Sequence, residues 1–303
     1  MPLILQTQTA PLEPPNKVTV AMPLDLREAG LVVCTGFQGT GKSYQTLHDV
    51  QRYLRMHPNR KSLFFDVNKE YGIDGCAKHG LNMLIKTLGP TAADIQRFTA
   101  HSIIEPRRVL AQDPKTGEDM NTEQMTETLA TIMTNFRHGI LLIEDMNTYI
   151  TDVRYIQRIE SIIVRLRHRE LDTIVHFQTL SALDTKMWQN VRYIRMHWQS
   201  DPVDRYEKRI SNFKLVKIAQ LLVDYMHDDR GDERFFVWIH MLKNKITGKF
   251  SKADFKLAVY RYLLLEGSEL RDAEKLVGNI PNQREAAFNR CYQKAVRLYG
   301  NSV

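Results

Sequence analysis

The feature that most constrains this chain is a glycine-rich loop placed directly after an apolar run. Residues 36–43 read Gly-Phe-Gln-Gly-Thr-Gly-Lys-Ser and fit the pattern G-x-x-x-x-G-K-[ST]. Apolar residues 31–34 come before this loop, and residues 43–53 have helical character. In such a loop successive backbone N–H groups surround phosphates, and a side chain at Gly39 or Gly41 would hold the backbone away from them. The sequence therefore predicts a strand, a phosphate-binding loop and a helix.

The loop residues carry separate expected roles toward ATP. We expect Lys42 to reach the β- and γ-phosphates and the Ser43 hydroxyl to bind Mg²⁺. The candidate nucleotide-binding residues are Gly36, Gln38, Gly39, Thr40, Gly41, Lys42 and Ser43. The alternative is a glycine-rich turn with a surface lysine, which the strand before the loop and the helix after it disfavour.

A second apolar run ends in two carboxylates. Residues 139–143 are a continuous apolar segment, typical of a parallel strand buried on both faces, and Glu144 and Asp145 follow it. The carboxyl end of such a strand opens on the ligand crevice. In a Walker B strand the first acid holds Mg²⁺ and the second polarises the attacking water. Here Glu precedes Asp, the reverse of the usual order. We assign Glu144 to the metal and Asp145 to the water, and the two roles could be exchanged. The alternative is an ordinary solvated strand end.

Two further groups are candidates for catalysis. The predicted strand 172–178 ends at Gln178, whose amide could bond the γ-phosphate and the attacking water; a capping glutamine is the alternative. The preceding helix, predicted over residues 153–170, carries Arg165, Arg167 and Arg169 near its end. These arginines spread around a helix, so they cannot all serve one partner. We expect one of them to act on a neighbouring subunit's nucleotide, with a solvated basic helix end as the alternative.

Length and composition limit the class of protein. A chain of 303 residues can bury one large α/β core and a smaller appendage. Its net charge of +7 favours a polyanionic partner. The three cysteines have no metal-ligand spacing, and Cys34 lies inside an apolar strand pattern, for which a reduced, cytoplasmic location is the simplest account. The sequence contains no apolar run of the roughly 18–20 residues that span a bilayer.

The alternation of strand and helix patterns predicts an α/β fold with a mostly parallel sheet and helices on both faces. We expect an N-terminal arm over residues 1–24, a P-loop core over 25–204 and a small α+β or helical part over 205–303. A basic turn at residues 243–250 could line a pore and contact phosphates; the alternative is a solvated turn on the outer face.

Taken together, these motifs resemble those of the FtsK–HerA superfamily of P-loop ATPases. Residues 66–71, Asp-Val-Asn-Lys-Glu-Tyr, are similar to its second-strand signature, and residues 167–172 with Gln178 are similar to its arginine-rich helix end and polar sensor. Residues 168–183 also resemble the filamentous-phage assembly, or zonula-occludens-toxin-like, ATPases. The resemblance covers about residues 30–196. It implies a RecA-like fold and homo-oligomeric, typically hexameric, rings that move DNA without reading its sequence.

Within that superfamily the chain is most similar to viral genome-packaging ATPases. Phage assembly ATPases usually carry a transmembrane helix after the ATPase domain, and the sequence shows none. We therefore expect an ATP-hydrolysing DNA translocase. The alternative is an ATP-gated assembly or scaffold module that binds a capsid or membrane-associated protein. A nucleotide kinase is disfavoured because no acceptor-binding lid is recognisable and the acid pair suits water activation.

Overall fold

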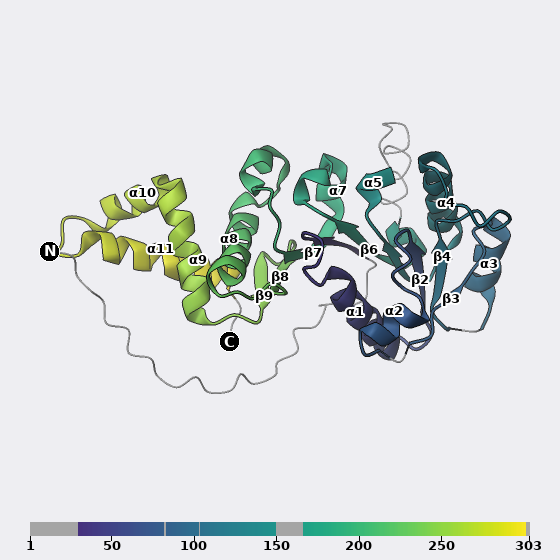
Figure 1. Ribbon diagram of the computed structural model, residues 1–303. Coiled ribbons are helices and arrows are strands. Elements are labelled where there is room, and N and C mark those ends of the chain that lie inside the picture. The colour runs from purple at the N-terminus through teal and green to yellow at the C-terminus, as the bar shows by residue number, and fades with distance from the viewer. Residues whose placement is uncertain (1–29, 82, 103, 150–165, 301–303) are drawn as a thin grey trace.

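The computed structural model describes residues 30–81, 83–102, 104–149 and 166–300, and the expected N-terminal arm lies outside them. Its centre is a nine-stranded sheet in the order β3-β4-β2-β5-β6-β1-β7-β8-β9 (Figure 1). The strands are β1 (Leu31–Thr35), β2 (Lys61–Asp66), β3 (Lys86–Thr87), β4 (Arg107–Leu110), β5 (Gly139–Ile143), β6 (Leu171–Phe177), β7 (Val191–His197), β8 (Phe236–His240) and β9 (Lys245–Gly248). The first seven strands in this order, β1 to β7 by number, pair in parallel. Strand β8 pairs antiparallel with β7, and β9 pairs antiparallel with β8.

Helices cover both faces of this sheet, which confirms the predicted fold class. In Figure 1, α1 and α2 lie below the sheet and α4, α5, α7 and α8 lie above it. The helices are α1 (Lys42–Met56), α2 (Ile73–Lys78), α3 (Ala92–Ala100), α4 (Thr122–Asn135), α5 (Met146–Tyr149), α7 (Thr185–Asn190), α8 (Phe213–Asp224), α9 (Lys252–Glu266), α10 (Ser268–Val277) and α11 (Gln283–Tyr299). Shorter helical turns are η1 (Leu166–Arg169), η2 (Leu180–Ala182), η3 (Val203–Arg209) and the π-helical η4 (Tyr225–Asp229).

Alternate strand residues feed two separate cores. Val32 and Ile140 pack with the α1 side chains in one apolar cluster, whereas Val33 and Leu141 join the larger cluster on the opposite face. This division follows from the two-residue period of a strand, since successive side chains point to opposite faces. Every residue of β1, β2, β5 and β6 is buried. The continuous apolar runs of residues 31–34 and 139–143 predicted this for β1 and β5.

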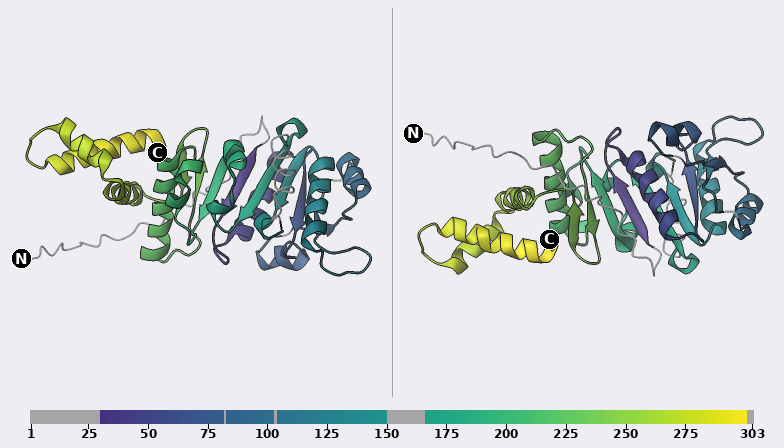
Figure 2. Two further views of the ribbon diagram at one scale, coloured as in Figure 1. Left: turned by 90° about the horizontal axis from the view of Figure 1, so that it is seen from above. Right: turned by 90° about the horizontal axis from the view of Figure 1, so that it is seen from below.

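The C-terminal third does not begin a separate sheet. Strand β8 pairs antiparallel with β7, with Phe236 opposite His197, and β9 pairs with β8. The expected boundary at residue 205 therefore runs through one continuous sheet. Helices α9, α10 and α11 lie beyond its β9 end (Figures 1 and 2). Ser251 and Asp254 form a capping box at the start of α9, as the spacing of these two residues predicts.

Several local expectations need correction. The polar-to-apolar pattern of residues 122–136 predicts a helix capped by Thr122, but in the structure Asn121 caps α4 and forms a capping box with Gln124. Residues 100–110 predict a short strand around residues 103–104, and the structure has it at β4, three residues farther along. Most of the helix expected over residues 153–170 lies outside the described residues, and its last part is the 3₁₀ turn η1. Within the predicted basic turn, Lys245 belongs to β9, and its ammonium donates to the carbonyls of Arg297 (3.0 Å) and Gly300 (2.8 Å) at the end of α11. That contact favours the non-DNA alternative for this lysine.

No helix within the described ranges combines the length and apolar character that crossing a bilayer requires.

A buried arginine ties α1 to the sheet. Arg195 of β7 is 0% exposed, and its guanidinium donates to the Asp49 carboxylate, to the Thr46 hydroxyl and to the carbonyl of Lys42 (2.8 Å). All three acceptors belong to α1, whose first residue is Lys42. Because a buried charge without a partner is costly, this contact fixes where the helix after the phosphate-binding loop begins.

We expect Arg195→Met to lower the free energy of unfolding by about 3–5 kcal/mol, because Asp49 would stay buried without its partner. The double variant Arg195→Met, Asp49→Leu should recover much of that loss, since no buried charge remains. Urea denaturation followed by circular dichroism measures both. A single variant as stable as the parent would show that the pair does not anchor α1.

Candidate nucleotide-binding site

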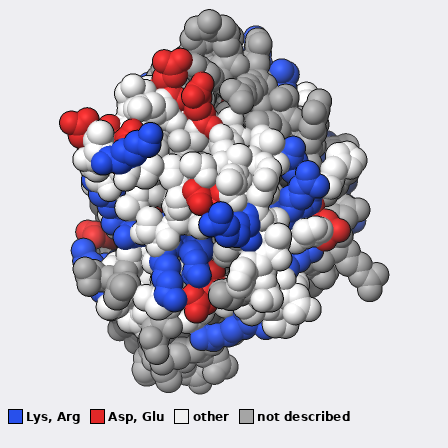
Figure 3. Space-filling model, turned by 90° about the vertical axis from the view of Figure 1, so that its right-hand side faces the viewer, with Lys and Arg blue, Asp and Glu red and all other residues white. Residues whose placement is uncertain are grey.

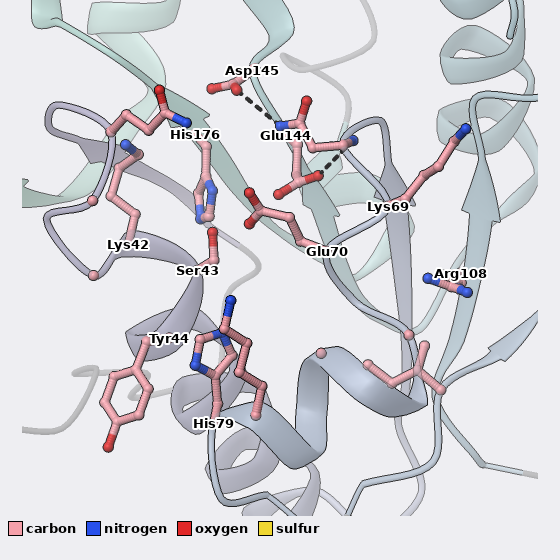
Figure 4. A pocket seen from close by; sticks show the side chains of 18 of the residues that line it. Lys42, Ser43, Tyr44, Lys69, Glu70, His79, Arg108, Glu144, Asp145 and His176 are labelled. Atoms are coloured by element: carbon pink, nitrogen blue, oxygen red, sulfur yellow. Dashed lines mark hydrogen bonds between the residues drawn. The ribbon is translucent and has the colours of Figure 1, made fainter.

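The largest collection of predicted site residues lies in one cavity at the carboxyl ends of the parallel strands. The cavity has a volume of about 1370 Å³ and is shown from close by in Figure 4. Its lining includes Gln38, Gly39, Gly41, Lys42, Ser43, Glu144, Asp145 and Gln178. Four strands contribute through the loops that follow them, because β2, β5, β6 and β1 are neighbours in that order. This is where a doubly wound sheet binds its ligands.

The loop between β1 and α1 has the backbone that its glycines predicted. Gly39 and Gly41 have φ values of +88° and +87°, in the left-handed region that favours glycine. At Gly36 a Cβ atom would lie 2.6 Å from Cβ of His197, so only glycine permits this approach to β7. The Nδ1–H of His197 donates to the carbonyl of Thr40 (2.9 Å). Burial, with the nearby charges of Arg195 and Lys42, holds the pKa of His197 well below its usual value, so the ring is neutral.

Lys42 lies at the centre of the loop. Its ammonium donates to the carbonyls of Gly36 (2.6 Å) and Phe37 (3.0 Å), so it holds the start of the loop against the start of α1. Burial lowers the pKa of Lys42, and the carboxylate of Asp145 acts in the opposite direction. The negative charge of Asp145 is therefore close enough to the Lys42 ammonium to interact with it electrostatically.

A buried histidine supports the first turn of α1. Nε2 of His176, on β6, lies 2.8 Å from the hydroxyl of Thr46. The same hydroxyl accepts from Arg195, so His176 and Arg195 both contact Thr46 in the first turns of α1. Burial lowers the pKa of His176 well below its usual value, so the ring is neutral. Sequence reasoning missed His176, His197 and Arg195; their signal was polar residues inside otherwise apolar strands.

The two acids differ in their surroundings. Glu144 is 1% exposed, and burial together with the charges of Asp66 and Glu70 raises its pKa well above the usual value. Asp145 is partly exposed and has a φ of +37°, uncommon for a residue other than glycine. Such strain is often found at functional sites.

Asn68 holds both acids from the loop after β2. Its backbone N–H donates to Oε2 of Glu144 (3.3 Å), and its side-chain amide donates to Oδ2 of Asp145 (3.1 Å) (Figure 4). The two acids are thus oriented by one residue of the resemblance signature 66–71. The neighbouring Glu70 lines the same cavity and points toward Ser43.

Asp66, the first residue of that signature, is structural. Its carboxylate accepts from the N–H groups of Glu70 (2.8 Å) and Tyr71 (3.1 Å) and from Arg108 (2.9 Å). The Tyr71 ring is fully buried against Phe64. Asp66 and Tyr71 therefore fix the loop that carries Asn68 and Glu70.

The residues fit a Mg²⁺ ion that arrives with a nucleotide. No group of three or more His, Cys, Asp or Glu side chains in the described part of the chain could hold a metal alone. Magnesium in nucleotide sites is bound by one or two protein groups together with phosphates and water. The Ser43 hydroxyl and the Glu144 carboxylate, both on the cavity wall, supply such a set.

The remaining predicted residues have different outcomes. Gln178 follows β6, between β5 and β1, and lies on the cavity wall beside the acids. Arg169 donates to the carbonyls of Met133 and Thr134 at the end of α4 in its own chain, an internal contact that neither the trans role nor the solvated helix end anticipated. Arg165 and the side chain of Arg167 lie outside what the structure describes.

No protein-family model matches the chain, and no curated protein matches it. Among solved structures, it is similar to the genome packaging NTPase B204 from Sulfolobus turreted icosahedral virus 2. The complex with ATP-gammaS is 17% identical, with 72% of this chain and 95% of that chain covered and a TM-score of 0.48. The complex with AMP is 16% identical, with 73% and 96% covered and a TM-score of 0.47.

The N-terminal domain of zonular occludens toxin from Neisseria meningitidis is more distant. It is 13% identical, with 55% of this chain and 76% of that chain covered and a TM-score of 0.29. These proteins belong to the two groups that the sequence resemblance named. Likeness at this level assigns no function, so the function rests on the residues of the cavity.

Replacing each acid by its amide should separate the two roles. We expect Asp145→Asn to bind ATP but stall hydrolysis, because the group that polarises water is lost. Glu144→Gln should in addition weaken Mg²⁺-dependent binding. Titration of a fluorescent ATP analogue with and without Mg²⁺, alongside phosphate release, measures both. Reversed phenotypes would show that the two acids have exchanged roles.

Proposed function

We propose that the protein is a Mg²⁺-dependent ATPase of the genome-packaging type, which couples hydrolysis to movement of DNA. The observation that carries this proposal is the meeting of Lys42, Glu144, Asp145 and Gln178 in one cavity at neighbouring strand ends. A structural lysine on a glycine-rich turn would not require an oriented acid pair opposite it.

The chain's residues have distinct parts in the proposed hydrolysis. Backbone N–H groups of the loop and the Lys42 ammonium bind the phosphates. Ser43 and Glu144 would hold Mg²⁺, which would act as a Lewis acid and neutralise developing charge. Asp145, held by Asn68, accepts the proton of a water whose oxygen bonds to the γ-phosphorus while the bond to the ADP oxygen breaks. Gln178 orients that water and senses the γ-phosphate.

DNA as the partner is supported by charge. The net charge of +7 favours a polyanion. On the face at the α3 and α4 end of the sheet, Lys and Arg side chains are spread over the surface with some Asp and Glu among them (Figure 3). Contacts between such cations and phosphates bind DNA without reading its sequence.

A protein partner is the second candidate, because the helices beyond β9 expose large apolar side chains. The exposed fractions are 64% for Leu265, 70% for Leu276 and 48% for Ile280. Under this candidate the ATPase site would gate binding of a capsid or membrane-associated protein through α9 to α11, without moving DNA.

DNA-stimulated hydrolysis distinguishes the two candidates. We expect duplex DNA to raise the rate of phosphate release, and random-sequence and homopolymer duplexes to do so alike.

Lys42→Ala should abolish hydrolysis with and without DNA, since the positive charge that acts on the β- and γ-phosphates is lost. Lys115→Ala removes an exposed lysine away from the cavity and serves as the control. Near-normal turnover in Lys42→Ala would refute the ATPase site, whereas a DNA-independent rate would favour the protein-partner candidate.

A homo-oligomeric ring, a hexamer by the superfamily resemblance, would let one subunit complete its neighbour's site. With Arg169 engaged in its own chain, Arg167 is the first choice for this role. We expect Arg167→Ala to lower turnover by roughly 10³-fold or more while nucleotide affinity barely changes. Mixing it with Lys42→Ala should restore partial activity, because some interfaces then contain both intact groups. No recovery in rings shown to mix would exclude a trans role for Arg167.

A further inference from the structure

One cavity residue comes from outside the predicted P-loop core. Arg234 lies in the turn between η4 and β8 and lines the same cavity as Lys42. Its side-chain stem lies against the phosphate-binding loop: Cγ is 3.8 Å, and Cδ 3.9 Å, from the position that a Cβ atom at Gly41 would occupy. No local sequence pattern connects this arginine with the phosphate-binding loop, since it lies 193 positions beyond Gly41.

The turn that carries Arg234 is fixed by hydrogen bonds. The N–H of Arg234 donates to Oδ1 of Asp232 (3.3 Å), and the N–H of Phe235 donates to the Asp232 carbonyl (3.1 Å). Asp232 in turn donates to the carbonyl of Met226 (2.9 Å) within η4. Phe235 is buried next to the start of β8. The stem of Arg234 is therefore placed by the fold.

The same turn is linked to the beginning of the phosphate-binding loop. The N–H of Phe37 donates to the carbonyl of Trp198 (2.8 Å), and the two rings meet edge to face at 6.1 Å. The Trp198 ring stacks on His227 of η4 at 4.4 Å. The loop and the Arg234 turn thus share one continuous set of contacts.

The strand order gives the direction from which Arg234 approaches. Asp145 follows β5 and Gln178 follows β6, which both lie on one side of β1, whereas Arg234 precedes β8 on the other side. A γ-phosphate near Asp145 and Gln178 leaves the α- and β-phosphates farther toward Arg234. Among the described residues no carboxylate lies within ion-pair distance of its guanidinium, a group suited to bidentate contact with phosphate.

We propose that Arg234 binds the α- and β-phosphates of the nucleotide held by its own subunit. This inference rests on the proposed nucleotide site and adds to it a binding residue supplied in cis by the C-terminal part of the chain. Because ADP retains both phosphates, Arg234 should hold ATP and ADP alike. It is a binding residue and makes no contact specific to the transition state.

The test compares Arg234→Ala and Arg234→Lys in the full chain by calorimetric titration of a non-hydrolysable ATP analogue and of ADP. We expect Arg234→Ala to raise both Kd values by at least about tenfold, with their ratio unchanged, because charge-assisted contacts to both ligands are lost. Arg234→Lys should recover part of this loss. The kcat at saturating ATP should change little. Lys249→Ala, which removes an exposed cation just after β9, is the matched control.

Three results would overturn the inference. Unchanged Kd values for both ligands would remove Arg234 from the site, and a lost kcat with unchanged ADP affinity would make it a transition-state group. Recovery of turnover at limiting ATP, on mixing Arg234→Ala with Lys42→Ala, would show action in trans. Thermal melting without nucleotide checks that each variant is folded. Failure of the nucleotide site itself would be seen separately, as absent binding or hydrolysis in the unmodified chain.

Discussion

The sheet is buried on both faces, and this one constraint decides where chemistry can occur. All residues of β1, β2, β5 and β6 are buried, so their backbone groups are used within the sheet and their side chains within two cores. Polar groups that must meet a ligand are confined to the loops after these strands. Because parallel strands end on the same edge, residues as distant in sequence as Lys42, Glu144 and Gln178 come together on one cavity wall.

Below that wall lies a layer of buried polar side chains that position the loops. Arg195 holds the start of α1, His197 holds the Thr40 carbonyl, and Asp66 holds the loop that carries Asn68. A buried polar group is costly when unpaired, so each of these contacts favours one loop conformation over others. The resulting rigidity suits phosphate binding, which requires N–H groups oriented before the ligand arrives.

Local sequence patterns predicted the strands and loops at the centre of the sheet. The parts of the fold that depend on contacts between distant residues could not be predicted in this way. The glycines of residues 36–41 predicted a left-handed backbone because that conformation is a property of the residues themselves. The continuation of the sheet through β8 depends on pairing between Phe236 and His197, which no local pattern specifies. The place of Arg234 beside Gly41 depends on the same pairing. The edge strand β3 was not predicted because it has only two residues, and the strand expected within residues 100–110 was misplaced because β4 contains the charged pair Arg107 and Arg108.

The fate of the basic residues shows why a count of charges does not locate a polyanion site. Lys245 and Arg169 both come from segments that sequence reasoning connected with phosphate contacts, yet each donates to carbonyls at the carboxyl end of a helix. Such contacts satisfy groups that a helix leaves unpaired and complement its dipole. A positive charge is available to a ligand only where the fold gives it no such internal acceptor. Arg234 lies on the cavity wall without an ion pair to any described carboxylate, and it is by this difference in surroundings that it becomes a candidate for binding phosphate.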